Sequence, residues 1–236
     1  MNLWLATALL LQDRTVEETF KKIEETVTKA KTIRIQFKSI ASGTEGAPAG
    51  EMSGTILLKE GNKALESYVW SAGGEQRNIF YASDGTHATF GSDLGRGGET
   101  YQADTFSASE GLSSRLGVAL VRFGQDPLAL LTCKTLFTCP AGYPCDPKAQ
   151  FRLSDFNAGP DYEGLKTMTY KLMVPETTGF HLTKIWYEPL SYKVVKRTLT
   201  QDIGRGPGKE RNMTETYKEW TLNADIPDEK FKLPER

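Results

Sequence analysis

Three cysteines lie in one short segment, and their spacing is the first pattern that could support chemistry. Cys133, Cys139 and Cys145 follow one another at equal intervals. Structural zinc sites bring cysteines closer together in pairs and complete the set with further cysteines or histidines. Neither histidine of the chain lies near this segment, so it predicts no metal site. Two alternatives remain open: a disulfide that joins two of the three cysteines, or a set of buried thiols.

Other residues with catalytic potential are isolated along the chain. His87 and His181 have no metal-ligand neighbour at helical or strand spacing. Asp155, Asp161 and Glu163 lack the spacing of a calcium loop. A G-x-S-x-G motif, which would carry a serine nucleophile, is absent from the sequence. We therefore expect no catalytic residue, no metal and no cofactor, and we expect that the protein is not an enzyme.

A glycine-rich run at residues 204–209, GRGPGK, has the composition of a phosphate-binding loop. Glu210 stands where such a loop needs serine or threonine, and Pro207 removes a backbone N–H that should face the phosphate. Strand patterns flank the run on both sides, so no helix N-terminus follows it. The run is interpreted as a hairpin loop.

The charge balance excludes some classes of partner. The chain has 29 basic and 30 acidic residues, a net charge of -1, and so no broad basic surface for nucleic acid or an anionic membrane. Hydrophobic residues make up 39%, and 22 glycines bring the composition close to that of globular domains. Aromatic residues make up 10%, which suits packing across the strands of a sheet.

Residues 3–11, LWLATALLL, form an uncharged apolar run that stops at polar residues. It is too short to span a bilayer, which needs about 20 residues. Residues 1–12 are therefore either a signal-peptide remnant or an apolar N-terminal segment, and the uninterrupted run favours the signal peptide. No shift of composition marks a boundary further on, so residues 13–236 are expected to form a single domain.

An amphipathic helix is predicted from Thr15. Thr15 and Glu18 have the spacing of a capping box. Apolar residues then recur at helical intervals while charged residues cover the other face. The apolar residues are Val16, Phe20, Ile23, Val27 and Ala30. A second helix, with the capping pattern at Ser107 and Glu110, is expected up to about residue 126.

Period-two alternation predicts that the rest of the chain is mostly strand. Asp84-Gly85 predicts a hairpin turn, and the short connections indicate antiparallel pairing. The tail from residue 225 is expected to be irregular. The expected strands are at residues 33–38, 55–59, 63–71, 78–82, 86–91, 166–174, 182–187, 192–200 and 210–222.

The order of these segments resembles that of the LolA-like outer-membrane lipoprotein-sorting proteins, the lipoprotein-carrier superfamily. After the first helix come TIRIQF at residues 32–37, GTILLK at 54–59 and FYASDGT at 80–86. Near the end come KIWYEP at 184–189, RTLT at 197–200 and ADIPDEKFKLP at 224–234. The resemblance covers most of residues 15–234, apart from the cysteine segment.

The resemblance implies an α+β fold, mainly antiparallel β: an unclosed, curved barrel, or half-barrel, of about 10–11 strands covered by helices. It also implies an exported, periplasmic protein that holds acyl chains of a lipid or a lipid-modified protein in an apolar cavity, in transport or as a chaperone. The family's carriers hold their lid with an arginine after the second strand. Here the segment reads KEGN at residues 59–62, which places Glu60 at that position.

Apolar strand positions are therefore the candidate binding residues, together with two leucines of the second helix. They are Ile35, Phe37, Ile56, Leu58, Tyr68, Trp70, Phe80, Phe90, Leu112, Leu116, Met168, Tyr170 and Trp186. The expected partners are a lipid or lipidated protein and proteins of the cell envelope, but no nucleic acid, and the chain is expected to be a monomer without a transmembrane span. The alternative is a sensor or interaction module of the same fold.

Overall fold

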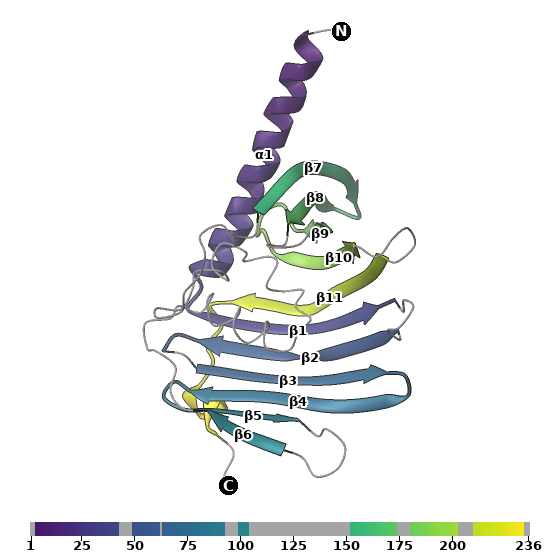
Figure 1. Ribbon diagram of the computed structural model, residues 1–236. Helices are drawn as coiled ribbons and strands as arrows, with labels where there is room; N and C mark the ends of the chain where they lie inside the picture. The colour runs from purple at the N-terminus through teal and green to yellow at the C-terminus, as the bar shows by residue number, and fades with distance from the viewer. Residues whose placement is uncertain are drawn as a thin grey trace, which may run out of the picture.

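The computed structural model describes residues 3–42, 49–61, 63–92, 99–103, 152–173, 180–202 and 210–233. These residues form one helix, one 3-10 helix and a single sheet of eleven strands (Figure 1). The helices are α1 (Leu3–Thr28) and η2 (Asp228–Phe231). The strands are β1 (Thr32–Ala41), β2 (Gly50–Lys59), β3 (Lys63–Ala72), β4 (Glu75–Asp84), β5 (Ala88–Ser92), β6 (Glu99–Ala103), β7 (Arg152–Tyr162), β8 (Leu165–Met173), β9 (Phe180–Tyr187), β10 (Val194–Asp202) and β11 (Glu210–Leu222).

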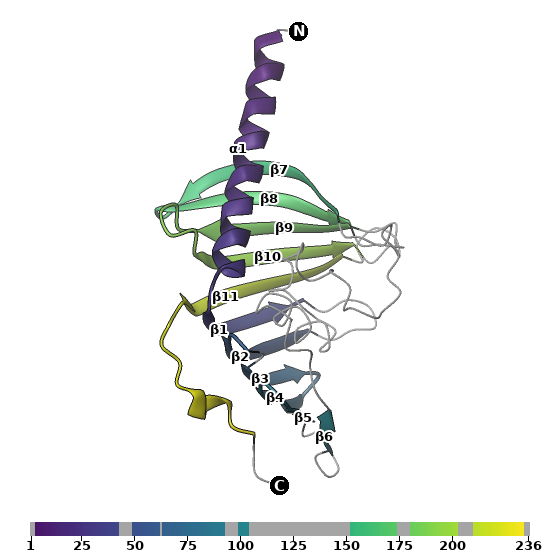
Figure 2. The same cartoon turned by 90° about the vertical axis from the view of Figure 1, so that its left-hand side faces the viewer.

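The sheet is antiparallel and open. Its strand order is β6-β5-β4-β3-β2-β1-β11-β10-β9-β8-β7, so β6 and β7 form opposite edges and do not pair with each other. The first and last long strands, β1 and β11, pair at the centre and join two meanders. The sheet twists strongly between its two halves (Figures 1 and 2).

These features confirm the predicted mainly antiparallel, unclosed fold, and the strand count agrees with the expectation. The predicted helical covering is seen in part, as α1; the second predicted helix and the three cysteines lie outside the described residues.

Helix α1 begins earlier than predicted. It runs without a break from Leu3, so the predicted capping role of Thr15 is wrong: the Thr15 carbonyl accepts a bond from Thr19 Oγ1 at 2.9 Å in mid-helix. The N-terminal turns extend past the sheet (Figure 1). Among the described helices, none combines the length and the apolar character needed to cross a membrane. The signal-peptide interpretation of residues 1–12 stays a prediction.

The C-terminal half of α1 packs against one face of the sheet, which we call the inner face. Figure 2 shows the helix crossing the strands at the β7 end. The Phe20 ring lies 4.9 Å from the ring of Tyr170 in β8 and 5.3 Å from that of Phe156 in β7, measured between centroids. Ile23 and Val27 are buried in the same cluster. The predicted apolar stripe of the helix is therefore its docking surface.

Gly54 lets an aromatic side chain lie flat across the inner face. It pairs with Tyr68 of β3 and Phe37 of β1, and the Tyr68 and Phe37 rings meet edge to face at 5.6 Å. A Cβ at Gly54 would collide with the carbonyl oxygen of Ser67 and lie 2.7 Å from the Tyr68 ring. This glycine is thus required by close packing across two strands.

Gly54→Ala is expected to destabilise the protein by about 1–3 kcal/mol, because the backbone of β3 must move to admit the methyl group. The shift of the urea midpoint at unchanged slope measures it. Gly50→Ala in the same strand is the control, since its Cβ would meet Ser71 and Ala72 only at 3.3 and 3.4 Å. Equal midpoints for the two variants would contradict this account.

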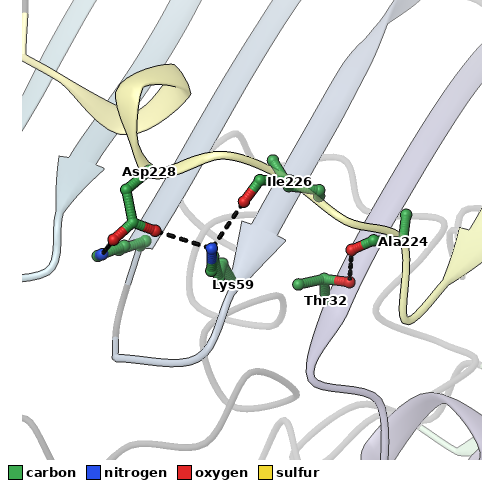
Figure 3. A network of polar contacts seen from close by, with 6 residues as sticks. Thr32, Lys59, Ala224, Ile226 and Asp228 are labelled. Atoms are coloured by element: carbon green, nitrogen blue, oxygen red, sulfur yellow. Dashed lines mark hydrogen bonds and ion pairs between the residues drawn. The ribbon is translucent and has the colours of Figure 1, made fainter.

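The chain after β11 crosses the other face of the sheet, the outer face. Ile226 and Phe231 are fully buried there against Leu57 of β2. The segment is irregular, as predicted, apart from η2. Figure 3 shows its polar attachments: Thr32 Oγ1 donates to the Ala224 carbonyl at 2.6 Å, and Lys59 Nζ donates to the Ile226 carbonyl at 2.7 Å. These contacts fasten the C-terminal segment across β1 and β2.

Asp228 anchors the segment to two lysines. Its carboxylate oxygens lie 2.8 Å from Lys59 Nζ and 2.5 Å from Lys63 Nζ. Hydrogen bonds from these ammonium groups lower the pKa of Asp228 from 3.8 to about 2. The depressed pKa means that the contact stabilises the folded state fully above pH 3.8, and that this stabilisation is lost as the pH falls through about 2.

Asp228→Asn is expected to speed amide hydrogen exchange in residues 224–231 at pH 7 and to leave exchange in β8 and β9 unchanged, because only the tail loses its anchor. At pH 2, where about half of the Asp228 carboxyl groups are protonated, the difference between the variant and the parent protein should be smaller than at pH 7. Glu229→Gln, one residue along in the exposed part of η2, is the matched control. A difference as large at pH 2 as at pH 7 would rule out the ion pairs as the cause.

Strand β7 is an irregular edge. Relative to its partner β8, strand β7 contains two extra residues. One lies between Ser154 and Asn157, and the other lies between Gly159 and Tyr162. Asp155 has a left-handed φ of 55°. Such bulges bend the edge and interrupt its row of hydrogen-bonding groups. From the sequence, no strand was predicted at residues 152–162 or at residues 99–103. Both segments form strands, β7 and β6, so the prediction was wrong there.

Candidate functional site

The inner face gathers most of the predicted binding residues. Seven of them are buried with the apolar residues of α1 in one continuous cluster that runs from β8 through the sheet centre to β3. They are Ile35, Phe37, Ile56, Leu58, Tyr68, Met168 and Tyr170. Register explains the grouping, since Ile35 pairs with Ile56 and Tyr170 lies two residues from Met168 on the same face. Their role as a binding surface stays a prediction.

Two predicted residues face the other way. Phe80 pairs with Ser67, the neighbour of Tyr68, so it lies on the outer face. Trp186 pairs with Thr167, the neighbour of Met168, and is likewise on the outer face. The prediction that they share a face with the others is wrong, because each was assigned one residue out of phase and the side-chain period of a strand is two.

Four predicted residues remain, of which Trp70 is on the inner face, two residues from Tyr68 in β3. Phe90 pairs with Tyr81 in the register of β4 and β5. Leu112 and Leu116 lie outside the described residues. Their assignment to a lid therefore stays a prediction.

Toward β4 the inner face continues beyond the buried cluster as a half-exposed apolar margin. Met52, Trp70 and Ile79 come from three successive strands and are each partly accessible. Arg77 lies over the Trp70 ring, 5.2 Å from its centroid, and is bonded to Glu75 at 2.7 Å. Helix α1 packs at the opposite end, against β7 and β8. The apolar face is therefore larger than the area that α1 covers.

Charged groups are buried within this apolar face. Arg197 of β10 and Glu215 of β11 pair across the strands, each 1% exposed, with Arg197 Nη2 3.6 Å from Glu215 Oε1. The Tyr217 hydroxyl donates to Glu215. Burial raises the pKa of Glu215, although Arg197 and Tyr217 act in the opposite direction. A second group lies on β3, where the Tyr68 hydroxyl donates to the fully buried Glu66 at 2.5 Å.

Sequence reasoning missed these buried charges. Arg197 and Glu215 each follow the alternation of their strand and occupy inner-face positions that would otherwise be apolar. The sequence did contain a sign of them: in each strand a charged residue stands at a position where the alternation calls for an apolar one. Polar groups within an apolar wall can orient the polar end of an amphiphilic ligand.

The site offers no arrangement for metal chemistry within the described residues, where no group of three or more His, Cys, Asp or Glu side chains could hold an ion. His181 lies in β9, and burial lowers the pKa of its imidazole. His87 lies in the turn after β4, 3.9 Å from Asp84.

Glu60, at the position of the family's lid arginine, is exposed in the turn between β2 and β3. Its backbone N–H donates to the Lys31 carbonyl at 3.0 Å. A carboxylate accepts hydrogen bonds and cannot donate them as a guanidinium does. The side chain at this position therefore cannot act as the family's arginine does.

Comparison with known proteins finds similarity in structure only. No family model matches the sequence, and no curated protein matches it. Among solved structures, the lipoprotein LppX of Mycobacterium tuberculosis aligns with 91% of this chain and 98% of its own, at 11% identity and a TM-score of 0.47. LprF of Mycobacterium bovis aligns with 91% and 96%, at 8% identity and a TM-score of 0.45. A LolA superfamily protein of Nitrosomonas europaea aligns with 92% and 97%, at 8% identity and a TM-score of 0.36. A LolA superfamily structure is thus among those similar to this chain, as the sequence resemblance indicated.

Proposed function

We propose that this protein is an exported carrier that holds the acyl chains of a lipid or a lipid-modified protein against the inner face of its sheet. The observation that supports this most directly is the extent of the apolar face. It continues past the area covered by α1 to the half-exposed Met52, Trp70 and Ile79.

Covering an alkyl chain on such a surface is favourable by about 0.8 kcal/mol per CH₂ removed from water. The affinity would then come from hydrocarbon contact, without metal, cofactor or covalent chemistry. The buried Arg197–Glu215 pair gives the same face a polar position that could orient a headgroup.

Extraction of the purified protein with organic solvent, followed by mass spectrometry, tests for a bound lipid directly. We expect lipid or lipopeptide in the extract, or uptake of added fatty acid by the extracted protein. A clean extract together with no uptake would overturn the proposal. Recovery of a stable protein partner and no lipid would instead support the sensor or interaction module.

The position of the ligand can be read from tryptophan fluorescence, because the chain has tryptophans on both faces. Trp70 lies on the inner face and Trp186 on the outer face. In a Trp4→Phe/Trp220→Phe background, one protein carries Trp186→Phe and keeps Trp70 as its one tryptophan, and its matched partner carries Trp70→Phe and keeps Trp186. Brominated stearate should quench the first protein more strongly. Equal quenching would contradict binding at the inner face.

A further inference from the structure

A groove of about 540 Å³ lies on the outer face, on the side of the sheet away from the proposed acyl-chain surface. We call it the lysine groove. Its basic lining comes from β9, β10 and β11, and its apolar wall from the β7–β8 hairpin. The defining residues are Lys184, Lys196, Lys218, Trp186, Tyr162 and Leu165.

Strand irregularities create this groove. Val195 is an extra residue in β10, since Val194 pairs with Tyr187 and Lys196 with Trp186. Lys218 is an extra residue in β11, opposite the step from Gln36 to Phe37. Bulges bend a strand and redirect its side chains. Both extra residues line the groove.

Trp186 brings two positive charges together. Lys184 Nζ lies 4.6 Å and Lys196 Nζ 4.7 Å from the centroid of the indole ring. The aromatic ring stabilises each ammonium group, but it does not neutralise either. Both ammonium groups therefore lie beside one ring, and an anion bound at this ring would be attracted by both of them.

No acidic side chain neutralises the three lysines within the described residues, where Lys184, Lys196 and Lys218 form no ion pair. One carboxylate, Asp161, lines the groove, and it is bonded to Lys166 at 2.6 Å. The groove therefore keeps a local positive charge in a protein whose net charge is -1.

Exposed apolar side chains lie in the groove wall, further along the same face of β9, and in the turn between β9 and β10. Tyr162 in the groove wall is 56% exposed, and Leu182, on the same face of β9 as Lys184, is 41% exposed. Leu190, in the turn between β9 and β10, is 95% exposed. Lysines beside tryptophan, tyrosine and leucine form the combination that suits the interface of an anionic membrane, where phosphates meet the outer part of the acyl layer.

We infer that the lysine groove docks the protein on a membrane surface by taking the phosphate of an anionic phospholipid headgroup. Lys184, Lys196 and Lys218 supply the positive charge. Tyr162, Leu182 and Leu190 lie against the interfacial layer. The inference concerns the outer face and does not depend on acyl-chain binding at the inner face.

The test is co-sedimentation of the full chain with vesicles of phosphatidylglycerol and phosphatidylcholine in equal parts, and with vesicles of phosphatidylcholine alone. We expect binding to the first only, and binding that weakens as salt is raised from 50 to 300 mM. Each lysine should contribute about fivefold, so Lys184→Gln/Lys196→Gln should weaken binding about 25-fold. Lys184→Arg/Lys196→Arg keeps the charge and should bind like the parent protein.

The matched control is Lys21→Gln/Lys29→Gln, which removes the same charge from exposed lysines in and directly after α1, away from the groove, and should retain binding. Thermal melting checks that each variant is folded. The inference is overturned if the groove and control variants lose binding equally, or if both vesicle types bind alike. It is also overturned if inorganic phosphate or hexaglutamate binds at the groove while vesicles do not. Quenching of Trp70 by brominated stearate should be unchanged in the groove variant, which keeps this result separate from the proposed function.

Discussion

Arg197→Met is expected to lower the free energy of unfolding by about 3–5 kcal/mol at pH 7.5, because it leaves Glu215 buried without its counter-charge. Both side chains are 1% exposed, so water cannot replace the lost partner. The exposed pair Lys193–Glu188, at 3.8 Å, provides the control. Lys193→Met should cost less than about 1 kcal/mol, since surface pairs contribute little.

The double variant Arg197→Met/Glu215→Met separates the charges from the packing. Two apolar side chains need no counter-charge, so it should recover most of the stability that Arg197→Met loses. Urea unfolding of the parent, the single variants and the double variant gives the interaction free energy between Arg197 and Glu215. A double variant as unstable as Arg197→Met would show that shape, and not charge, sets the cost.

The loss should also depend on pH. The pKa of Glu215 is already raised by burial, and removal of Arg197 raises it further. A raised pKa means that the folded state keeps its proton where the unfolded state has lost it, so this contribution to stability falls as the pH rises above about 4.5. Arg197→Met should therefore be closer to the parent protein at pH 5 than at pH 8. A difference that does not change with pH would exclude ionisation of Glu215 as the cause.

Phe20→Ala is expected to lower the free energy of unfolding by about 3–5 kcal/mol, because it removes the ring that joins α1 to β7 and β8. Phe20 is 2% exposed and contacts the rings of both Phe156 and Tyr170. Leu190→Ala is the control. Its side chain is 95% exposed, so its substitution should change stability by less than about 0.5 kcal/mol.

Amide exchange gives the position of this effect. With Phe20 removed, exchange should rise first in β7 and in the last turns of α1, while the β3–β4 hairpin stays protected. Calorimetry measures the loss of stability, and hydrogen exchange followed by mass spectrometry shows which strands lose protection. A loss below about 1 kcal/mol would mean that the helix docks mainly through Ile23 and Val27.

Strands with regular alternation were predictable from the sequence. In residues 33–37 each apolar residue is followed by a polar one, and the three apolar side chains all lie on the inner face. Asp84-Gly85 marked a turn correctly, and Gly85 has a φ of 101°. Local pattern was sufficient there because the same alternation sets both the strand and its buried face.

Irregular strands could not be predicted in this way. In residues 152–162 two bulges and Pro160 break the period, so no alternating pattern exists. Trp186 was assigned to the inner face as an apolar strand position, yet its ring lies beside Lys184 and Lys196 on the outer face. The lysine groove depends on extra residues in two strands that are distant in sequence from the β7–β8 hairpin, and single-strand patterns carry no information about such tertiary neighbours.

The bulged edge strand has a consequence for self-association. An open sheet normally offers its last strand as a template on which a second chain can add by main-chain hydrogen bonds, the first step toward fibrils. At β7 an incoming strand would meet a proline without an N–H and two breaks in the spacing of donors and acceptors. An incoming strand could therefore pair with β7 over only a few residues before the hydrogen-bonding register is lost. This edge of the sheet is thus protected against the addition of further chains, even at high concentration.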